Sequence, residues 1–417
     1  MTLAIAVFAV ALAAIATERV DRTKAALAGA IVMLLTQTID QEHAIEAIDF
    51  NTIGLLAGMM LMVKITEGTG VYTWLAVKAG QLSRGRPVLV VVSLVATTAI
   101  LSAFLDNLTT VLLVVPMTFL LADALDIDPI PLVIIEIIAS NIGGTATLIG
   151  DPPNILIAGE TGLSFTAFIA NLAPVAFIAI VVVTAVLYLA YRPRLQVPPA
   201  ARDRVLELRA SDTIEDADEL RRTVPILVAT IVLFFAHKAL RLEPATVALA
   251  GATVMLFVTR QSVERALAGI EWPTLFFFMG LFVMVGALEE RGAIERVAEG
   301  IADLTDGSRT AEILGIAWAS VLGSAIVDNI PFTATMIPIV DSLQGDGGDD
   351  AYWWALALGA CFGGNATIIA AAANVAAAGM AARAGRPISF MTFLRAGIPA
   401  TLLSMAVATA YIWIRYL

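Results

Sequence analysis

The chain has 417 residues, of which 59% are hydrophobic and only 15% are charged; its net charge is -11 and its mean hydropathy +0.87. A soluble domain carries about 25% charged residues, so this composition excludes an ordinary soluble protein and predicts a helical protein that crosses the membrane many times. The acidic balance belongs to the loops, and nothing suggests nucleic acid as a partner. A single cysteine, Cys361, excludes an internal disulfide, and with only two histidines we expect no metal site and no cofactor.

Apolar segments in chain order predict five spans in each half of the chain, separated by a polar linker. The first span starts at the beginning of the chain without a basic segment before it, so we expect no cleaved signal peptide. Residues 192–223 carry mixed charges and a Pro-Pro pair, which indicate a solvated, cytoplasmic linker. The predicted spans are residues 2–17, 25–39, 52–65, 130–158 and 165–191 in the first half, and 224–240, 245–259, 274–288, 352–380 and 390–416 in the second.

The second half of the chain repeats the first. Thr52 aligns with Thr274, a separation of 222 residues (274 minus 52), and nearly the same shift aligns the polar segments of the two halves. Repeats that carry matched polar residues in a hydrophobic chain are typical of secondary transporters, and they place the binding site at those polar segments. We therefore predict a first repeat at 1–191, the linker at 192–223 and a second repeat at 224–417. The matched pairs include Asp106-Asn107 with Asp328-Asn329, Gly143-Gly144 with Gly363-Gly364, Thr147 with Thr367, and Asn154 with Asn374.

Two further segments, residues 87–125 and 310–343, each hold a polar pair between two apolar stretches. Each could be one overlong helix, two spans joined by a tight turn, or a re-entrant hairpin with its tip near mid-membrane. The basic residues favour the hairpin. With the first residue outside, Arg19, Arg22, Lys24 and the linker arginines all fall inside, and the loop around Lys238 is the exception. This count predicts ten spans and two re-entrant hairpins in inverted repeats, inserted in the cytoplasmic membrane.

The hairpin tips carry the first pair of candidate sites, Asp106 to Thr110 and Asp328 to Thr333. An ionised aspartate at mid-membrane costs about 2.5–3.5 kcal/mol on insertion scales, so a cation, a proton or helix-end dipoles must offset it. Pro331 suits the first turn of a new helix. The alternative is that Asp106 only caps a helix at the membrane surface, but the recurrence of the motif in the second repeat favours a binding site.

The second pair of candidate sites lies in residues 130–158 and 352–380, where glycine pairs and Pro152-Pro153 predict broken helices. The alternative is that the glycines serve a contact between helices. Glu136 could carry a proton or could pair with a backbone donor. The predicted substrate- or ion-binding residues are Asp106, Asn107, Thr109, Thr110, Asn141, Gly143, Gly144, Thr145, Thr147, Asp151, Asn154, Asp328, Asn329, Thr333, Gly363, Gly364, Asn365, Thr367 and Asn374, with Asp106, Asp328 and Glu136 as proton-coupling candidates.

These segments resemble the ArsB/NhaD family of the ion transporter superfamily, which includes arsenite efflux permeases, sodium/proton antiporters and the P protein. More distantly they are similar to divalent anion/sodium symporters, whose tips carry Ser-Asn-Thr. The resemblance implies a scaffold and a moving transport region with elevator-like motion, and Asn107, Thr109, Asn329 and Thr333 in the site. The alanines before Asn374 depart from the family, where glycine and serine are common, and remove a hydroxyl from a second ion site.

We expect a transporter in the lipid bilayer and not an enzyme. The leading hypothesis is proton-coupled transport of a small inorganic ion or metalloid, such as arsenite or a similar small oxyanion or hydroxide. Arsenite would be held as the neutral hydroxide because one cysteine cannot supply several thiolates. A sodium/proton antiporter and a sodium-coupled dicarboxylate symporter are the alternatives, and a homodimer is one expected assembly. An intramembrane aspartyl protease is disfavoured because Leu148 stands where that motif needs glycine. A channel is disfavoured because inverted repeats with broken helices supply alternating access.

Overall fold

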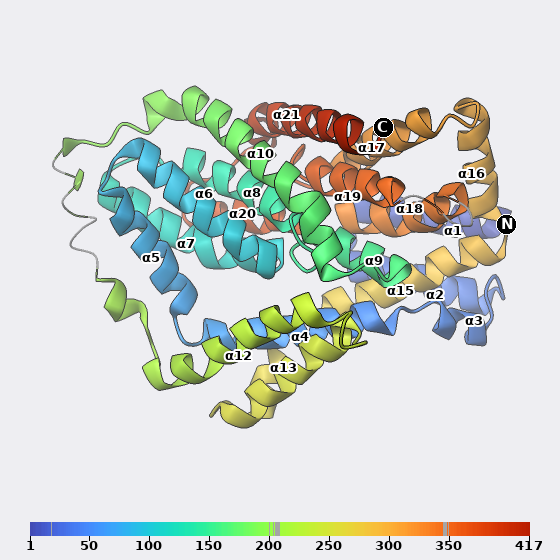
Figure 1. Ribbon diagram of the computed structural model, residues 1–417, viewed down its shortest axis with the longest axis horizontal. Helices are drawn as coiled ribbons and strands as arrows, with labels where there is room; N and C mark the ends of the chain where they lie inside the picture. Colours follow the sequence, from blue (N-terminus) through green and yellow to red (C-terminus); the bar gives the residue numbers. More distant parts are fainter. Residues whose placement is uncertain (18, 200, 203, 205–208, 345–347, 349) are drawn as a thin grey trace.

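The computed structural model describes the chain except for residues 18, 200, 203, 205–208, 345–347 and 349, and every regular element in the described part is a helix (Figure 1). The first half contains α1 (Thr2–Ala16), α2 (Arg22–Leu35), α3 (Gln41–Glu46), α4 (Phe50–Glu67), α5 (Val71–Ser83), α6 (Pro87–Phe104), α7 (Asn107–Leu125), α8 (Pro129–Gly144), α9 (Pro152–Thr161) and α10 (Phe165–Tyr191). The second half contains α12 (Ala217–Ala236), α13 (Pro244–Val258), α14 (Val263–Ala268), α15 (Trp272–Glu290), α16 (Ala293–Leu304), α17 (Arg309–Ile326), α18 (Asn329–Gln344), α19 (Ala351–Gly363), α20 (Ala372–Arg383) and α21 (Phe390–Tyr416).

The two halves are inverted copies of one fold. Each helix of the first half has a counterpart at nearly the same position in the second, so that α6 and α7 correspond to α17 and α18. Figure 1 shows α5 and the α6–α7 hairpin at the left of the molecule, and α16 and the α17–α18 hairpin at the right. The two hairpins therefore enter from opposite ends, which confirms the predicted all-α fold with inverted repeats.

Six helices in the described part of the chain are long and apolar enough to cross a membrane. Four shorter apolar helices, α1, α8, α13 and α19, accompany them, and α8 and α19 are short because the spans predicted there are interrupted. Large apolar side chains such as Phe177, Phe257 and Ile414 are exposed on the outside of the bundle. That surface suits hydrocarbon and would be unfavourable in water, so this is a multi-pass membrane protein.

Four helices cross in the centre of one unit, which we call the scaffold and which comprises α1–α4 and α12–α15. α2 packs on α15 and, at the equivalent place, α13 packs on α4. A Cβ added at Gly280 would lie 2.8 Å from the backbone of Ala26, and one added at Gly58 would lie 2.8 Å from the backbone of Ala248. Small residues let membrane helices approach this closely, and the repeat reproduces the contact on both sides.

A second unit, the transport unit, comprises the hairpins, the broken helices and the two long helices: α6–α10 and α17–α21. α6 packs on α8 and α17 on α19, while α7 contacts α20 and α18 contacts α9, so that helices of both repeats interlock. The transport unit meets the scaffold where α18 contacts α15 and where α9 contacts α4. The site is built inside the transport unit and against this boundary.

Three elements differ from the sequence-based expectation. α5 and α16, which run between the scaffold and the hairpins, were not expected, because neither coincides with a predicted span or hairpin. α16 is amphipathic: Ile294 and Ala298 are buried whereas its charged side chains are exposed. α12 starts at Ala217, inside the predicted linker and before the predicted start at residue 224, because Asp216 caps its first turn through the amides of Asp218 and Glu219. Part of the linker lies outside the described residues.

Candidate transport site between the hairpin tips and the broken helices

Each hairpin tip is a short extended turn between two helices. α6 ends at Phe104 and α7 begins at Asn107, and the corresponding turn separates α17 from α18. Asp106 caps α7, since its Oδ1 accepts from the Thr109 amide at 2.8 Å and its Oδ2 accepts from the Thr109 hydroxyl at 2.5 Å. Asp328 accepts from the amide of Ile330 at 3.0 Å. Both aspartates therefore cap helices, as the alternative interpretation of the sequence expected for Asp106. They do so at hairpin tips that are packed inside the bundle.

Two asparagine side chains close the broken helices. Asn154 donates through Nδ2 to the carbonyl oxygens of Thr145 (3.0 Å) and Thr147 (2.8 Å). Asn374 donates in the same way to the carbonyl oxygens of Gly364 (2.7 Å) and Thr367 (2.8 Å). A helix end leaves carbonyls without partners, and in a membrane interior they must be satisfied by protein. These two predicted site residues therefore hold the shape of the breaks.

Two threonine hydroxyls tie each break to the hairpin of its own repeat. Thr147 donates through Oγ1 to the carbonyl of Ala103, near the end of α6. Thr367 donates to the carbonyl of Ala325, near the end of α17, at 2.9 Å. The sequence placed both threonines at the site, and the structure shows that they position the tips.

Sequence reasoning missed a pair of serines with a similar role. Ser102 donates to the carbonyl of Ser140 at 2.7 Å, and Ser324 donates to the carbonyl of Ala360 at 2.6 Å. All four residues are buried. The signal was present, because Ser102 and Ser324 occupy equivalent positions of the repeat, both just before the tips.

The glycine pairs combine the two roles that the sequence left open. A Cβ at Gly143 would lie 2.6 Å from the Cα of Ala99 on α6, so this glycine permits a helix contact; Gly363 packs on α17 in the same way. A Cβ at Gly144 would lie 2.6 Å from the carbonyl oxygen of Gly150 across the break. The first glycine of each pair therefore serves packing, and Gly144 allows the chain to fold back on itself.

Asp151 is the centre of the site. It stands at the N-cap position of α9 but makes no capping bond there. Its Oδ1 instead accepts from the side-chain amides of Asn107 (3.3 Å) and Asn329 (3.1 Å), one from each hairpin tip. The carboxylate is fully buried, and its Oδ2 has no hydrogen-bond partner among the described residues. The second repeat has Ala371 at the equivalent place, so this charge occurs once.

A network of side-chain amides surrounds this carboxylate and draws on both repeats. Asn107 also donates to Asn141 Oδ1 at 3.1 Å. Asn141 in turn donates to Asn365 Oδ1 and to Asn374 Oδ1, both at 3.0 Å. The Nδ2 of Asn365 is buried and has no partner within the described part of the chain. The network thus leaves one acceptor, on Asp151, and one donor, on Asn365, without a protein partner.

The remaining predicted residues lie at the edge of this network or away from it. The hydroxyls of Thr145 and Thr333 donate to backbone carbonyls within their own helices, and that of Thr110 is buried without a partner among the described residues. Glu136 is buried in α8 and accepts from the Thr118 hydroxyl at 2.6 Å, and among the described residues no hydrogen bond joins it to the amide network. Across the described ranges, no group of three or more His, Cys, Asp or Glu side chains could hold a metal ion.

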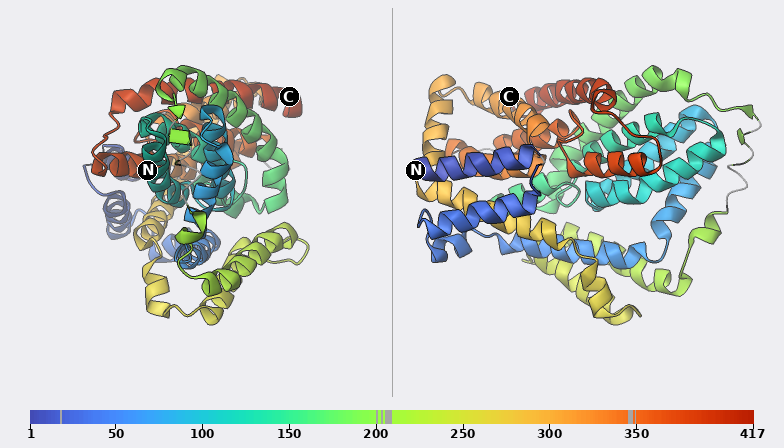
Figure 2. Two further views of the ribbon diagram at one scale, coloured as in Figure 1. Left: turned by 90° about the vertical axis from the view of Figure 1, so that its left-hand side faces the viewer. Right: turned by 180° about the vertical axis from the view of Figure 1, so that it is seen from behind.

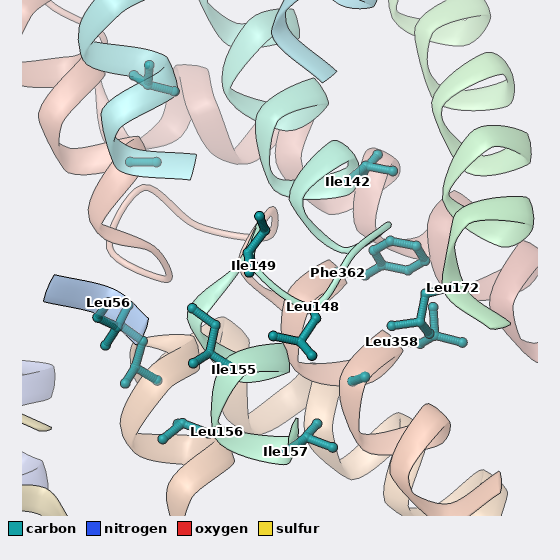
Figure 3. Close-up of a cluster of buried hydrophobic side chains, with 14 of the residues drawn as sticks. Leu56, Ile142, Leu148, Ile149, Ile155, Leu156, Ile157, Leu172, Leu358 and Phe362 are labelled. Carbon is teal, nitrogen blue, oxygen red and sulfur yellow. The ribbon is translucent and has the colours of Figure 1, made fainter. Parts of the chain in front are cut away.

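Apolar side chains enclose the site. Figure 3 shows Ile142, Leu148, Ile149 and Phe362 around the break between α8 and α9, and all four are buried. Leu56 of the scaffold reaches the same cluster. Such surroundings strengthen the hydrogen bonds of the network and make an unpaired polar atom costly. The two buried, unpaired atoms, Oδ2 of Asp151 and Nδ2 of Asn365, are therefore where a hydrogen-bonding ligand would gain most.

Inverted repeats whose hairpin tips and broken helices meet at one buried polar centre define a secondary membrane transporter. The chain belongs to the citrate transporter family, CitMHS, whose family model matches residues 12–359. This membership supports a transporter rather than an enzyme.

Known relatives agree with this assignment. The 46 kDa membrane protein of Mycobacterium leprae is 40% identical over 423 residues, which cover 100% of this chain and 99% of that protein. The human P protein is 34% identical over 502 residues, covering 100% of this chain and 60% of that protein, and it confirms the resemblance inferred from the sequence. The crystal structure of the YdaH transporter of Alcanivorax borkumensis has a TM-score of 0.62 at 16% identity, covering 92% of this chain and 88% of that one, and supports the fold.

Proposed function

We propose that this protein carries a small, neutral, hydrogen-bonding solute across the membrane, coupled to protons, by elevator-type alternating access. The observation that carries the proposal is Asp151, a fully buried carboxylate that both hairpin tips contact and that keeps one oxygen free of any described partner. A buried, unpaired charge is unfavourable, and binding a proton at the free oxygen neutralises it. A group so placed can take up and release a proton as the tips move.

The chemistry of the two unpaired atoms, Oδ2 of Asp151 and Nδ2 of Asn365, favours a neutral hydroxide as the substrate. Arsenite is the example to test. A hydroxyl group donates and accepts, and so matches the free acceptor of Asp151 and the free donor of Asn365. A single cysteine, Cys361, excludes a cage of several thiolates for trivalent arsenic. Recognition would therefore rest on amides and one carboxyl group.

Sodium/proton exchange is the second candidate, and the same carboxylate favours it, because a sodium ion could replace the proton at Asp151. Sodium would use only oxygen ligands and would leave the Asn365 donor unmatched. Citrate, the substrate in the family's description, is a third solute to test. Its negative charges would meet the Asp151 carboxylate, and the guanidinium at the tips, that of Arg22, already pairs with Asp328 at 3.4 Å.

The elevator component rests on how the two units meet. The hairpins and broken helices of both repeats interlock within the transport unit, whereas its contacts with the scaffold are confined to a few helix pairs such as α15 with α18 and α4 with α9. A unit that carries its whole site can move as one body without disassembling that site. Alternating access by movement of the whole unit therefore breaks fewer contacts of the site than rearrangement of the tips would.

The test uses the full-length protein in liposomes that enclose a pH-sensitive dye. Arsenite, sodium and citrate are added separately, and solute-driven proton movement and counterflow are recorded. We expect arsenite to move protons in the wild type, and Asp151→Asn to abolish proton movement while solute exchange persists. Asp123→Asn, which removes an exposed carboxylate of α7, is the control and should behave as the wild type. Proton-coupled flux that persists in Asp151→Asn would contradict the proposal.

A further inference from the structure

A cavity of about 360 Å³ connects the scaffold to both hairpin tips. Its lining includes Arg22 of the scaffold, Leu108 of the first tip, Asp328 of the second tip, and Ile369 and Ala372 of the second break. α2 begins at Arg22, and this end of the helix lies well inside the outline of the molecule (Figure 2, right). The cavity is therefore the space next to the central site where the scaffold faces both tips at once.

Arg22 makes a polar contact across the boundary between the two units. Its Nη1 lies 3.4 Å from Oδ2 of Asp328, at the second tip of the transport unit. Its Nη2 donates to the hydroxyl of Thr274 at 3.4 Å, and its guanidinium lies 5.4 Å from the centre of the Phe277 ring, both on α15 of the scaffold. The arginine is thus anchored on the scaffold by α2 and α15 and reaches out to one aspartate of the transport unit.

A second carboxylate stands ready on the scaffold side. The hydroxyl of Thr274, which accepts from Arg22, donates to Oε2 of Glu271 at 3.2 Å. If Asp328 moves away with the transport unit, Arg22 keeps its hydrogen bond to Thr274. Glu271 then remains as the nearby carboxylate, because Thr274 bridges it to Arg22. The guanidinium is therefore not left without a counter-charge, which is the main cost of breaking an ion pair.

The repeat does not reproduce Arg22 at the other end of the scaffold. The repeat counterparts of Glu271 and Thr274 are Asp49 and Thr52, and the Thr52 hydroxyl donates to Asp49 just as Thr274 donates to Glu271. The counterpart of Arg22 is Pro244, which has no charge. The inverted symmetry therefore reproduces the carboxylate and the threonine at the opposite end, but not the arginine that forms an ion pair with a hairpin tip.

We propose that Arg22 is a latch that holds the transport unit in the conformation seen here, by its ion pair with Asp328, and that this pair breaks in each transport cycle. The inference rests on the proposed movement of the transport unit. The side chains of Arg22 and Asp328 are 25% and 12% exposed, so water can reach the pair. The free energy needed to break it is therefore small enough for each cycle. Since the latch has no counterpart, it favours this conformation over the opposite one.

A disulfide reporter tests the latch without any transport measurement. A Cβ at Gly159 of α9 would lie 2.8 Å from Oγ1 of Thr52 on α4 and closer still to Oδ2 of Asp49, the end of a side chain that must turn aside. Thr52→Cys removes the hydroxyl that holds this carboxylate, so Thr52→Cys with Gly159→Cys, in a Cys361→Ala background, should cross-link the two units in this conformation. The same cysteine pair is made with Arg22 and with Arg22→Gln, and oxidised under limiting conditions in liposomes. We expect Arg22→Gln to slow cross-linking by up to about fivefold, because the loss of one partly exposed ion pair changes the equilibrium constant between the conformations by about that factor.

Three further variants make the result decisive. Arg22→Lys keeps the charge and should keep most of the rate, and Asp328→Asn should slow it as Arg22→Gln does. Arg19→Gln, which removes a charge three residues before Arg22, should leave it unchanged. A cysteine pair within the scaffold, Gly54→Cys with Ala245→Cys, should cross-link equally in every variant, since a Cβ at Gly54 would lie 3.2 Å from that of Ala245. Equal rates with Arg22 and Arg22→Gln would overturn the latch, and so would slowing of the scaffold pair, which would make Arg22 a folding residue.

Discussion

At the scale of single residues, the three aspartates of the site, Asp106, Asp328 and Asp151, differ in the hydrogen bonds that their carboxylates accept. Asp106 and Asp328, which recur in the repeat, cap helices through backbone amides. Asp151, which does not recur, leaves its own helix uncapped and accepts from both tips. The sequence drew attention to the recurring pair for proton coupling, and they remain candidates. The repeat describes the framework, and departures from it, such as Asp151 and Arg22, are the residues to which we assign proton coupling and the latch.

Glu136 allows a prediction at this scale, because the sequence left open whether it carries a proton or is structural. It is buried and accepts from the Thr118 hydroxyl. Thr118→Val removes the one donor and should lower the free energy of unfolding by about 1–3 kcal/mol. Glu136→Gln keeps an acceptor for Thr118 and should leave proton-coupled transport intact, as measured in dye-loaded liposomes.

A matched control is available on the neighbouring helix α6. Thr98 is fully buried and its hydroxyl has no partner among the described residues, so Thr98→Val removes a hydroxyl without breaking a hydrogen bond. This change should leave the thermal unfolding temperature in detergent unchanged or raise it. Loss of proton coupling in Glu136→Gln, with normal folding, would instead make Glu136 part of the proton path.

At the scale of elements, the hairpins and broken helices could be predicted because their signals are local. A polar pair between two apolar stretches predicted hairpins at 87–125 and 310–343, where α6–α7 and α17–α18 are found, and glycine and proline pairs predicted the breaks. α16 could not be recognised from its charges, since an amphipathic helix and an acidic loop share that composition. Contacts such as those of Ser102 and Arg22 depend on which helices meet in three dimensions, which one sequence does not reveal.

The packing of α6 on α8 depends on one missing side chain, which leads to a prediction for that element pair. A Cβ at Gly143 would lie 2.6 Å from Ala99 Cα and 2.7 Å from its carbonyl oxygen, and backbone atoms cannot turn aside. Gly143→Ala should therefore push the two helices apart and destabilise the protein by about 1–3 kcal/mol. Gly315, inside α17, has open space around its Cβ position, so Gly315→Ala should be neutral or stabilise by up to about 1 kcal/mol. Thermal unfolding in detergent compares the two, and equal effects would rule out the steric argument.

At the scale of the whole molecule, the scaffold and the transport unit both follow the inverted symmetry of the repeats, and each departs from it at a few residues. The scaffold repeats its central crossing on both sides, through Gly58 and Gly280, and gives a symmetric track. The transport unit interlocks helices of both repeats, so that the tips and breaks would move together in the proposed mechanism. A symmetric track with a one-sided contact at Arg22 would make the two end states similar in architecture but unequal in energy.

Movement of one unit along the other leads to the last prediction, which concerns transport itself. Thr52→Cys with Gly159→Cys joins α4 of the scaffold to α9 of the transport unit, whereas Gly54→Cys with Ala245→Cys joins α4 to α13 within the scaffold. If the transport unit must slide, oxidation of the first pair should stop solute counterflow in liposomes and reduction should restore it. Oxidation of the second pair should leave counterflow unchanged, because neither helix changes partner. Counterflow at the full rate through protein cross-linked between the units would require the site to open by local movement of the tips, and the elevator mechanism would then be wrong for this chain.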